Sequence, residues 1–292
     1  MNFTYFPLIV LDTKTYENHI PPKNVVNTIS KLLKKCSIRL TKEKMFFILP
    51  DQVANGGVSM WCELKQANFF DEYRMDGVNE YELNEIYLEI VAENLCRAIK
   101  SANNAKSLKI KLTKKQVPCL TVEIELPSLS STARIVTHDI PVSVIPSSLW
   151  GEYQEPEMPD FHVSLCLPPL KTVKHIVERL KNLSSYLTLS GNQEGDFALK
   201  VETELVSATT RFSDLEIPPY DPDGDSQAPS KLWPPSEMAS ARIDVKKLLQ
   251  FLAGQQINPY KVICNIVDQS AVHFFLVHDD ISLQYFIPVV AV

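Results

Sequence analysis

The chain has 292 residues, which is enough for two ordinary domains that each bury a core of their own. No apolar run approaches the roughly 20 residues needed to span a bilayer, which excludes a typical helical membrane protein. The net charge of −6, taken alone, argues against a nucleic-acid partner. The N-terminus lacks the basic and apolar regions of a signal peptide, so we expect an intracellular protein.

In the first half of the chain, apolar spacing predicts one-sided helices set between short strands. We expect helices over 23–35 and 91–102. The expected strands are at about 2–10, 37–41, 45–49, 57–64, 85–90, 106–113, 120–126 and 134–144, with an ambiguous stretch at 69–75.

Residues 145–160 change character, because they hold three prolines and four acids without a base. This composition predicts an extended linker between two domains, 1–144 and 161–292. The second half restarts the pattern, and its stretch 213–238, with six prolines and six acids against one lysine, predicts a mobile surface loop. The remaining elements are expected as strands at 161–167, 185–189, 195–202 and 204–212, a helix over 169–182, and a final strand and helix unit over 239–290.

The two halves repeat one order of elements. Residues 86–142 and 241–289 each read as a strand, a short helix, two alternating strands and a last strand that ends in Ile-Pro-Val. In the first copy Ile90, Leu95 and Ile99 have the spacing of Ile243, Leu248 and Leu252 in the second. We therefore predict an α+β fold of two duplicated domains, each with two helices packed on mostly antiparallel sheet.

Positive charge is concentrated on the four predicted helices. They carry twelve lysines and arginines against three acids, a net of +9 that leaves −15 for the rest of the chain. A basic face on one helix is usually no more than a solvated face, but four of them in an acidic chain favour contact with duplex phosphates. No aromatic residue is interleaved, which argues against single strands. The predicted DNA-facing residues are Lys31, Lys34, Arg97, Lys100, Lys171, Lys174, Lys181, Lys246 and Lys247.

The sequence offers no clear catalytic or metal site. Its six cysteines and six histidines lack the spacing of metal ligands, and Asn55-Gly56-Gly57 has the pattern of a hairpin turn rather than of a phosphate loop. We therefore expect no enzymatic activity, cofactor or metal. Two alternatives stay open: a protein–protein adaptor whose basic faces never meet DNA and, more remotely, an unrecognised hydrolase.

Several long strings of residues resemble the Hus subunit family of the DNA-damage checkpoint clamp. They are Ala-Asn-Gly-Gly-Val-Ser-Met-Trp-Cys-Glu-Leu at 54–64, Arg-Ile-Val-Thr-His-Asp-Ile-Pro at 134–141, Lys-Leu-Leu-Gln-Phe-Leu-Ala-Gly-Gln-Gln at 247–256 and Ser-Leu-Gln-Tyr-Phe-Ile-Pro at 282–288. The likeness runs from about residue 24 to the C-terminus. One departure is the connection over 11–22, which is longer than the family's.

The resemblance implies a non-enzymatic subunit with the DNA-clamp fold of the replication sliding clamp. Such a subunit joins two other Rad-family clamp subunits in a heterotrimeric ring that encircles double-stranded DNA without sequence preference. It further implies loading at damage sites by a clamp loader, checkpoint kinase signalling, recruitment of DNA repair enzymes and a nuclear location, with a cytoplasmic pool left open.

Two predicted strands are candidates for contacts between subunits. Pro141 lacks an N–H group, which confines it to an edge strand or a strand end. An exposed edge is an aggregation hazard unless another strand pairs with it. In clamps the edges corresponding to 134–144 and 204–212 meet neighbouring subunits. The expected interface residues are Ile135, Thr137 and Asp139 toward one partner, and Val206, Ala208 and Thr210 toward the other.

Overall fold

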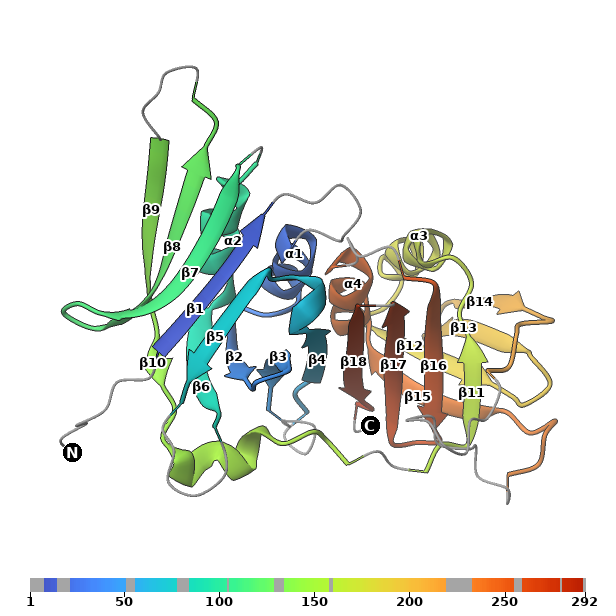
Figure 1. Ribbon diagram of the computed structural model, residues 1–292. Helices are drawn as coiled ribbons and strands as arrows, with labels where there is room; N and C mark the ends of the chain where they lie inside the picture. The colour runs from blue at the N-terminus through green and yellow to red at the C-terminus, as the bar shows by residue number, and fades with distance from the viewer. Residues whose placement is uncertain are drawn as a thin grey trace. The chain divides into compact units, whose positions relative to one another are not determined.

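The structure is a computed structural model that describes residues 8–14, 22–50, 56–77, 84–103, 105–128, 134–157, 160–218, 233–254, 259–278 and 280–290 (Figure 1). The chain divides into two compact units. The first comprises Met1–Leu49 and Cys62–Gln154, and the second comprises Pro50–Trp61 and Glu155–Val292.

The first unit contains two α-helices and two sheets. In sheet order, its strands are β5-β1-β7-β8-β9 and β10-β6-β2-β3-β4. In chain order, the elements are β1 (Leu8–Lys14), α1 (Pro22–Leu32), β2 (Lys35–Leu40), β3 (Lys44–Leu49), β4 (Ser59–Lys65), the short 3₁₀ helix η2 (Gln66–Asn68), β5 (Glu72–Asp76), β6 (Ile86–Val91), α2 (Ala92–Lys100), β7 (Ser107–Lys114), β8 (Pro118–Leu126), β9 (Arg134–Pro141), β10 (Ser143–Val144) and the 3₁₀ helix η3 (Ser147–Tyr153).

The second unit repeats this plan. Its sheets run β11-β16-β17-β18 and β15-β12-β13-β14, which match β1-β7-β8-β9 and β6-β2-β3-β4 strand for strand. The predicted duplication and the α+β class are therefore confirmed. The elements are β11 (Val163–Cys166), α3 (Leu170–Leu180), β12 (Tyr186–Gly191), β13 (Phe197–Glu202), β14 (Ser207–Phe212), β15 (Ala239–Asp244), α4 (Val245–Gly254), β16 (Lys261–Val267), β17 (Ala271–His278) and β18 (Ile281–Pro288).

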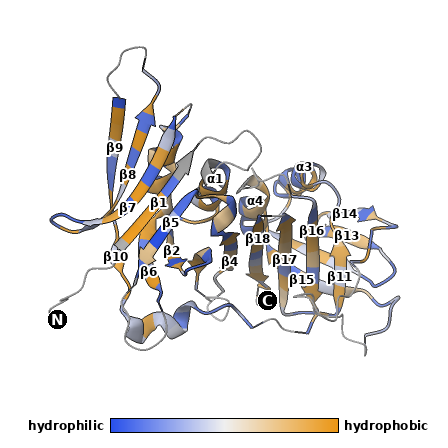
Figure 2. Cartoon of the chain, viewed as in Figure 1, coloured by the Kyte–Doolittle hydropathy of each residue, from blue (hydrophilic) through white to orange (hydrophobic). Residues whose placement is uncertain are grey.

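Local periodicity explains why these segments fold as they do. In β7 the side chains of Leu108, Ile110 and Leu112 alternate with polar neighbours, and all three are buried. Hydrophobic and hydrophilic positions alternate visibly along β8 and β9 in Figure 2. Helices α1 and α2 pack side by side in the first unit, as α3 and α4 do in the second. Each helix thus buries an apolar face and leaves a polar face outside.

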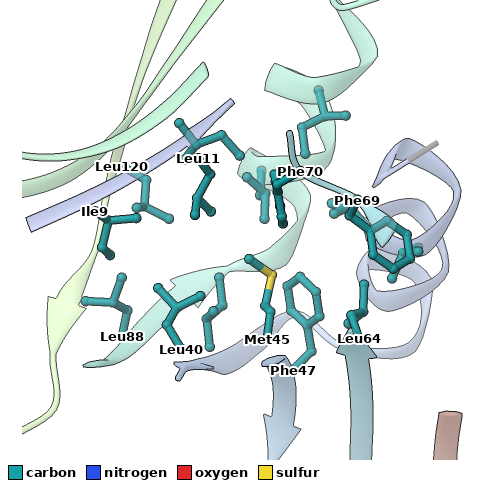
Figure 3. Close-up of a pocket in the computed structure, with 16 residues that line it drawn as sticks. Ile9, Leu11, Leu40, Met45, Phe47, Leu64, Phe69, Phe70, Leu88 and Leu120 are labelled. Atoms are coloured by element: carbon teal, nitrogen blue, oxygen red, sulfur yellow. The ribbon is translucent and has the colours of Figure 1, made fainter. Parts of the chain in front are cut away.

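The core of the first unit contains an apolar cavity of about 40 Å³ (Figure 3). Both sheets and both helices contribute to its walls, which include Val26 from α1, Leu95 from α2, Leu11 from β1 and Met45 from β3. Its lining exposes no polar surface, so the space is suited to hydrocarbon rather than to water.

Some expected boundaries differ in the structure. The first helix ends at Leu32, so Lys34 lies between α1 and β2, and β14 begins at Ser207 rather than at 204. The extended linker predicted at 145–160 is wrong over Ser147–Tyr153, where η3 forms. Trp150 explains this helix, because its ring stacks on Tyr87 and its indole N–H donates to the carbonyl of Ile145.

Three expectations fall partly outside the described residues. They concern the start of the strand at 2–10, most of the connection over 11–22 and the centre of the loop at 213–238.

Candidate nucleic-acid interface

Helix α3 presents a basic face to solvent. Val173, Val177 and Leu180 are buried, which directs the opposite face outward. That face carries Lys171, His175 and Arg179, all exposed and spaced four residues apart. Lys181, which follows the helix, is also exposed, whereas Lys174 is half-buried and its Nζ lies 3.7 Å from Glu178 Oε1. The three lysines predicted for this helix therefore lie on it or next to it, with Lys174 partly engaged.

Helices α1 and α2 carry fewer basic residues. Lys31 and Lys34 are exposed at the end of α1 and just after it, and Arg97 and Lys100 are exposed on α2. Arg97 donates to Glu93 one turn earlier, with Nη2 2.5 Å from Oε1. Since this pair is neutral overall, Lys100 supplies the excess positive charge of α2.

Helix α4 separates its two predicted lysines. Asp244 precedes the helix, and its carboxylate accepts from the backbone N–H of Lys246 at 2.7 Å, as an N-cap residue does. The Lys246 side chain is exposed, whereas that of Lys247 is half-buried and donates to the carbonyl of Gly56. The Lys247 ammonium is thus already engaged by a backbone carbonyl, whereas that of Lys246 has no carboxylate nearby among the described residues.

The helix lysines differ from those on the strands in their electrostatic partners. Most lysines on or beside the strands lie within 4 Å of a carboxylate, and the pairs are Lys35–Glu89, Lys44–Glu63, Lys106–Glu125, Lys109–Asp12, Lys111–Glu123, Lys115–Asp139, Lys200–Glu202 and Lys261–Glu216. In the described part of the chain, no carboxylate lies within this distance of six basic side chains on or beside the helices, which are Lys34, Lys100, Lys171, Arg179, Lys181 and Lys246. Among the described residues, uncompensated positive charge therefore lies on and beside the helices, and also at exposed lysines elsewhere such as Lys42, Lys65 and Lys114.

Arg179 and His175 were not among the sequence predictions, although the sequence contains their signal. Both follow Lys171 at steps of four residues, which places them on one helical face. Arg179 forms no ion pair with a described residue, so it belongs with the predicted lysines as a candidate phosphate contact.

The titratable groups in the cores are unsuited to chemistry. Burial raises the pKa of Cys36 to about 12, and it raises those of Cys62 and Cys264 as well, which keeps these thiols protonated. Burial lowers the pKa of His273 to about 3, and its Nδ1 lies 3.0 Å from the amide nitrogen of Asn265. Within the described ranges no group of three His, Cys, Asp or Glu side chains could hold a metal ion, and no helix is long and apolar enough to cross a membrane.

Strand β9 is the last strand of its sheet, and its open edge can be assigned. Val142, just beyond it, donates its N–H to the carbonyl of Pro118 on the β8 side at 3.0 Å. Because alternate residues of an antiparallel strand point their backbone groups the same way, Ile135, Thr137 and Asp139 direct theirs away from β8. These are the three residues predicted for this interface.

The Asp139 side chain is held in place beside this edge. Its carboxylate accepts from the hydroxyl of Thr121 at 2.7 Å and from the ammonium of Lys115. The hydrogen bonds from Lys115 and Thr121 lower the pKa of Asp139. A partner at this edge would therefore meet an ionised, oriented carboxylate.

Strand β14 is the last strand of its own sheet, and the same alternation applies. Thr203 donates its N–H to the carbonyl of Val206 at 2.9 Å, which fixes the register of the β13–β14 hairpin. Ser207, Thr209 and Arg211 therefore direct their backbone groups to the open edge. The predicted residues alternate with them, since Ala208 and Thr210 bond toward β13 and Val206 lies in the turn before the strand.

This architecture is similar to that of known sliding-clamp proteins. Solved structures with a similar fold include Proliferating Cellular Nuclear Antigen from Entamoeba histolytica, with a TM-score of 0.70 and 12% identity over 97% of this chain and 99% of that one. PCNA from Thermococcus kodakaraensis gives a TM-score of 0.64 and 16% identity over 97% and 100%. The chain therefore has the PCNA-like clamp fold, as predicted.

Sequence comparison is more specific. Checkpoint protein HUS1 of Homo sapiens is 55% identical over 264 residues, covering 90% of this chain and 92% of that protein. Checkpoint protein Hus1-like of Drosophila melanogaster is 30% identical over 271 residues, covering 91% and 93%. The family model described as Hus1-like protein matches residues 16–291, and the chain therefore belongs to the Hus1-like family, as its sequence predicted.

Proposed function

We propose that this protein is a non-enzymatic subunit of a heterotrimeric ring that encircles duplex DNA at sites of damage. Its partners would be two other Rad-family clamp subunits, and its domains would be 1–144 and 161–292, joined by 145–160. The ring, placed on DNA by a clamp loader in the nucleus, would promote checkpoint kinase signalling and recruit repair enzymes. Membership of the Hus1-like family and the clamp fold support this assignment.

The observation that carries the DNA contact is the difference between helix and strand lysines. Most lysines on or beside the strands lie close to a carboxylate, as Lys111 does to Glu123 at 2.7 Å. Lys171 and Lys181 are exposed without such a partner in the described part of the chain. Unbalanced lysines can release counterions from DNA on binding, whereas paired ones gain little. Because a ring retains DNA by enclosure, a few such charges suffice to offset phosphate repulsion and permit sliding.

Charge reversal on α3 tests the proposal. Changing Lys171, Lys174 and Lys181 together to Glu should weaken association of the assembled trimer with duplex DNA at least about tenfold at low salt, because three attractive charges become repulsive. The matched control changes three exposed lysines outside the helices, Lys42, Lys65 and Lys114, to Glu and so alters the net charge equally. Fluorescence anisotropy with a labelled duplex measures both, and circular dichroism checks the fold.

The outcome separates the two candidate functions. Loss of DNA association in the α3 variant alone supports the clamp. If both variants associate with DNA as the unchanged protein does while the trimer still forms, the chain is an adaptor whose basic helices do not meet DNA.

A further inference from the structure

The turn between β13 and β14 exposes the most accessible large apolar side chain of the described residues. Leu205 is 93% exposed, and its neighbour Val206 is 44% exposed. The other large apolar side chains on the described surface reach at most 65%. A leucine this exposed contributes almost nothing to the stability of its own chain. The free energy of burying its side chain can therefore be gained on binding a partner.

This turn is held rigid by hydrogen bonds across its base. Thr203 donates from its N–H to the carbonyl of Val206 at 2.9 Å, and its hydroxyl lies 3.1 Å from the same carbonyl. The N–H of Val206 in turn donates to the hydroxyl of Thr203 at 3.0 Å. An anchor on a fixed turn loses less conformational entropy on binding than one on a loose loop. Leu205 is thus preorganised for docking.

The surroundings of Leu205 indicate what it would dock against. The turn continues directly into the open edge of β14, where Ser207 and Thr209 direct their backbone groups outward. Beside Leu205 the side chain of Glu204 is exposed, and Glu202 pairs with Lys200 at 2.6 Å. If a strand of a partner pairs with this edge, the end of the partner's sheet lies over Leu205. A basic side chain of the partner would be favoured opposite Glu204.

We propose that Leu205 is the anchor of the subunit contact at the β14 edge and docks into an apolar socket with a basic rim on a clamp subunit of different sequence. The inference rests on the proposed function and deepens it, because it assigns one side chain to partner choice.

The β9 edge of a second copy of this chain does not provide that socket. Every described strand pair in both units is antiparallel, so extension of either sheet places the start of one strand beside the end of the other. Leu205 lies at the start of β14, and the exposed Ile135 lies at the start of β9. If β14 of one copy paired with β9 of another, these two apolar side chains would therefore lie at opposite ends of the interface.

The residues that Leu205 would meet at the β9 edge of a second copy offer no large exposed apolar side chain. The end of β9 carries Asp139 and Pro141, with Ser143 just beyond, and all three are exposed. Asp139 is ionised and paired with Lys115, so this end offers no net positive charge to Glu204. Burying a leucine against this end forfeits the apolar contact and gives Glu204 no net opposite charge, so the anchor discriminates against the β9 edge of its own chain.

The test measures binary affinities of the full chain for each of the two Rad-family clamp subunits from the same organism, by biolayer interferometry. Leu205→Ala should raise the Kd for one subunit at least about tenfold and leave the other unchanged. Leu205→Met, which keeps the apolar volume, should stay within about threefold. The control Met238→Ala removes a 40% exposed side chain just before β15, at the opposite edge of the same sheet, and should change neither Kd.

The outcomes are distinguishable. If the unchanged chain binds neither subunit, the proposed function fails before the anchor is tested. If it binds both and Leu205→Ala is neutral or weakens both equally, the clamp assignment stands and the anchor is refuted. Loss of a self-association of the unchanged chain in Leu205→Ala would also overturn the inference, because the occupant would then be a second copy.

Discussion

Arg39 and Glu85 form a two-pronged ion pair in the first unit, with Arg39 Nε 3.0 Å from one carboxylate oxygen and Nη2 2.7 Å from the other. The two side chains are only 18% and 11% exposed. The guanidinium also lies over the ring of Phe46, 5.1 Å from its centroid, and over that of Tyr87 at 5.6 Å. Arg39 is therefore compensated from three sides in a mostly apolar setting.

Removing this carboxylate should be costly. Glu85→Ala removes the carboxylate that pairs with a largely buried guanidinium, and we expect the free energy of unfolding to fall by about 3 kcal/mol. The control Glu89→Ala, on β6, breaks the more exposed pair with Lys35 and should cost at most about 1 kcal/mol. Urea unfolding of both variants measures this difference, and equal losses would show that the Arg39 site is not effectively buried.

The apolar cavity of the first unit predicts that one added methylene is stabilising. Val26 lines the cavity and keeps a β-branched shape in Val26→Ile, which should raise the free energy of unfolding by up to about 1 kcal/mol. Val122 is fully buried away from the cavity, so Val122→Ile should overpack its site and cost about 1–3 kcal/mol. Thermal unfolding monitored by calorimetry distinguishes the two signs. Destabilisation by both substitutions would mean that the cavity closes in solution.

Acid should weaken the second unit through His273. Its pKa is lowered to about 3 in the fold, against 6.5 for an ordinary histidine, so below pH 6.5 the unfolded chain binds a proton that the folded chain excludes. The contribution of His273 to the free energy of unfolding is fully present above pH 6.5. It is lost as the pH falls, at up to about 1.4 kcal/mol per pH unit.

The control for this titration is His273→Gln, whose amide oxygen can still accept from the Asn265 side chain but does not titrate. Urea midpoints between about pH 4 and pH 6.5 should show a flatter slope in the variant. A slope identical to that of the unchanged protein would mean that His273 is protonated in the fold.

Arg179 should contribute to DNA association in the way that we propose for the predicted lysines. In the assembled trimer, Arg179→Gln should reduce the slope of log Kobs against log salt by about 0.9, the value for one lost phosphate contact. Lys200→Gln removes a cation that is already paired with Glu202 and should leave the slope unchanged. Salt titrations with a labelled duplex give both values. A normal slope for Arg179→Gln would place that side chain away from the phosphates.

Alone, the chain should be a monomer or a weakly self-associating species. The ends of its two open edges do not match in self-pairing, because Leu205 and Ile135 lie at the starts of their strands. Multi-angle light scattering should report the mass of one chain alone and of a 1:1:1 complex after both partners are added. A stable homotrimer of the purified chain would contradict the heterotrimer.

The sequence predicted most of the fold, because strand and helix periods are local properties. The alternation of Leu108, Ile110 and Leu112 identified β7 without knowledge of its neighbours. The 3₁₀ helix η3 was missed, because it depends on Trp150 reaching Tyr87, a residue 63 positions earlier in the chain. The prolines and acids of this segment predict an extended conformation, but packing of Trp150 on Tyr87 stabilises a helix there instead.

The candidate site was predicted unevenly for the same reason. The exposure of Lys171 follows from helical phase alone. The engagement of Lys247 by the carbonyl of Gly56 requires two segments 191 residues apart to meet. The direction of the backbone groups in β14 depends on the turn at Thr203, which composition does not reveal. Local sequence patterns thus predict which face of a helix or strand is exposed. Long-range contacts determine which of the exposed side chains remain available for binding.

The duplication has a consequence for the symmetry of any assembly. The place of β9 in the first unit is that of β18 in the second, and β14 corresponds to β4, so the two open edges β9 and β14 are not equivalent. Contacts made through them join unlike surfaces, head to tail. A closed ring built this way has no two-fold axis in its plane, and its two sides therefore differ. A protein that recognises one side would therefore always bind on the same side of the ring.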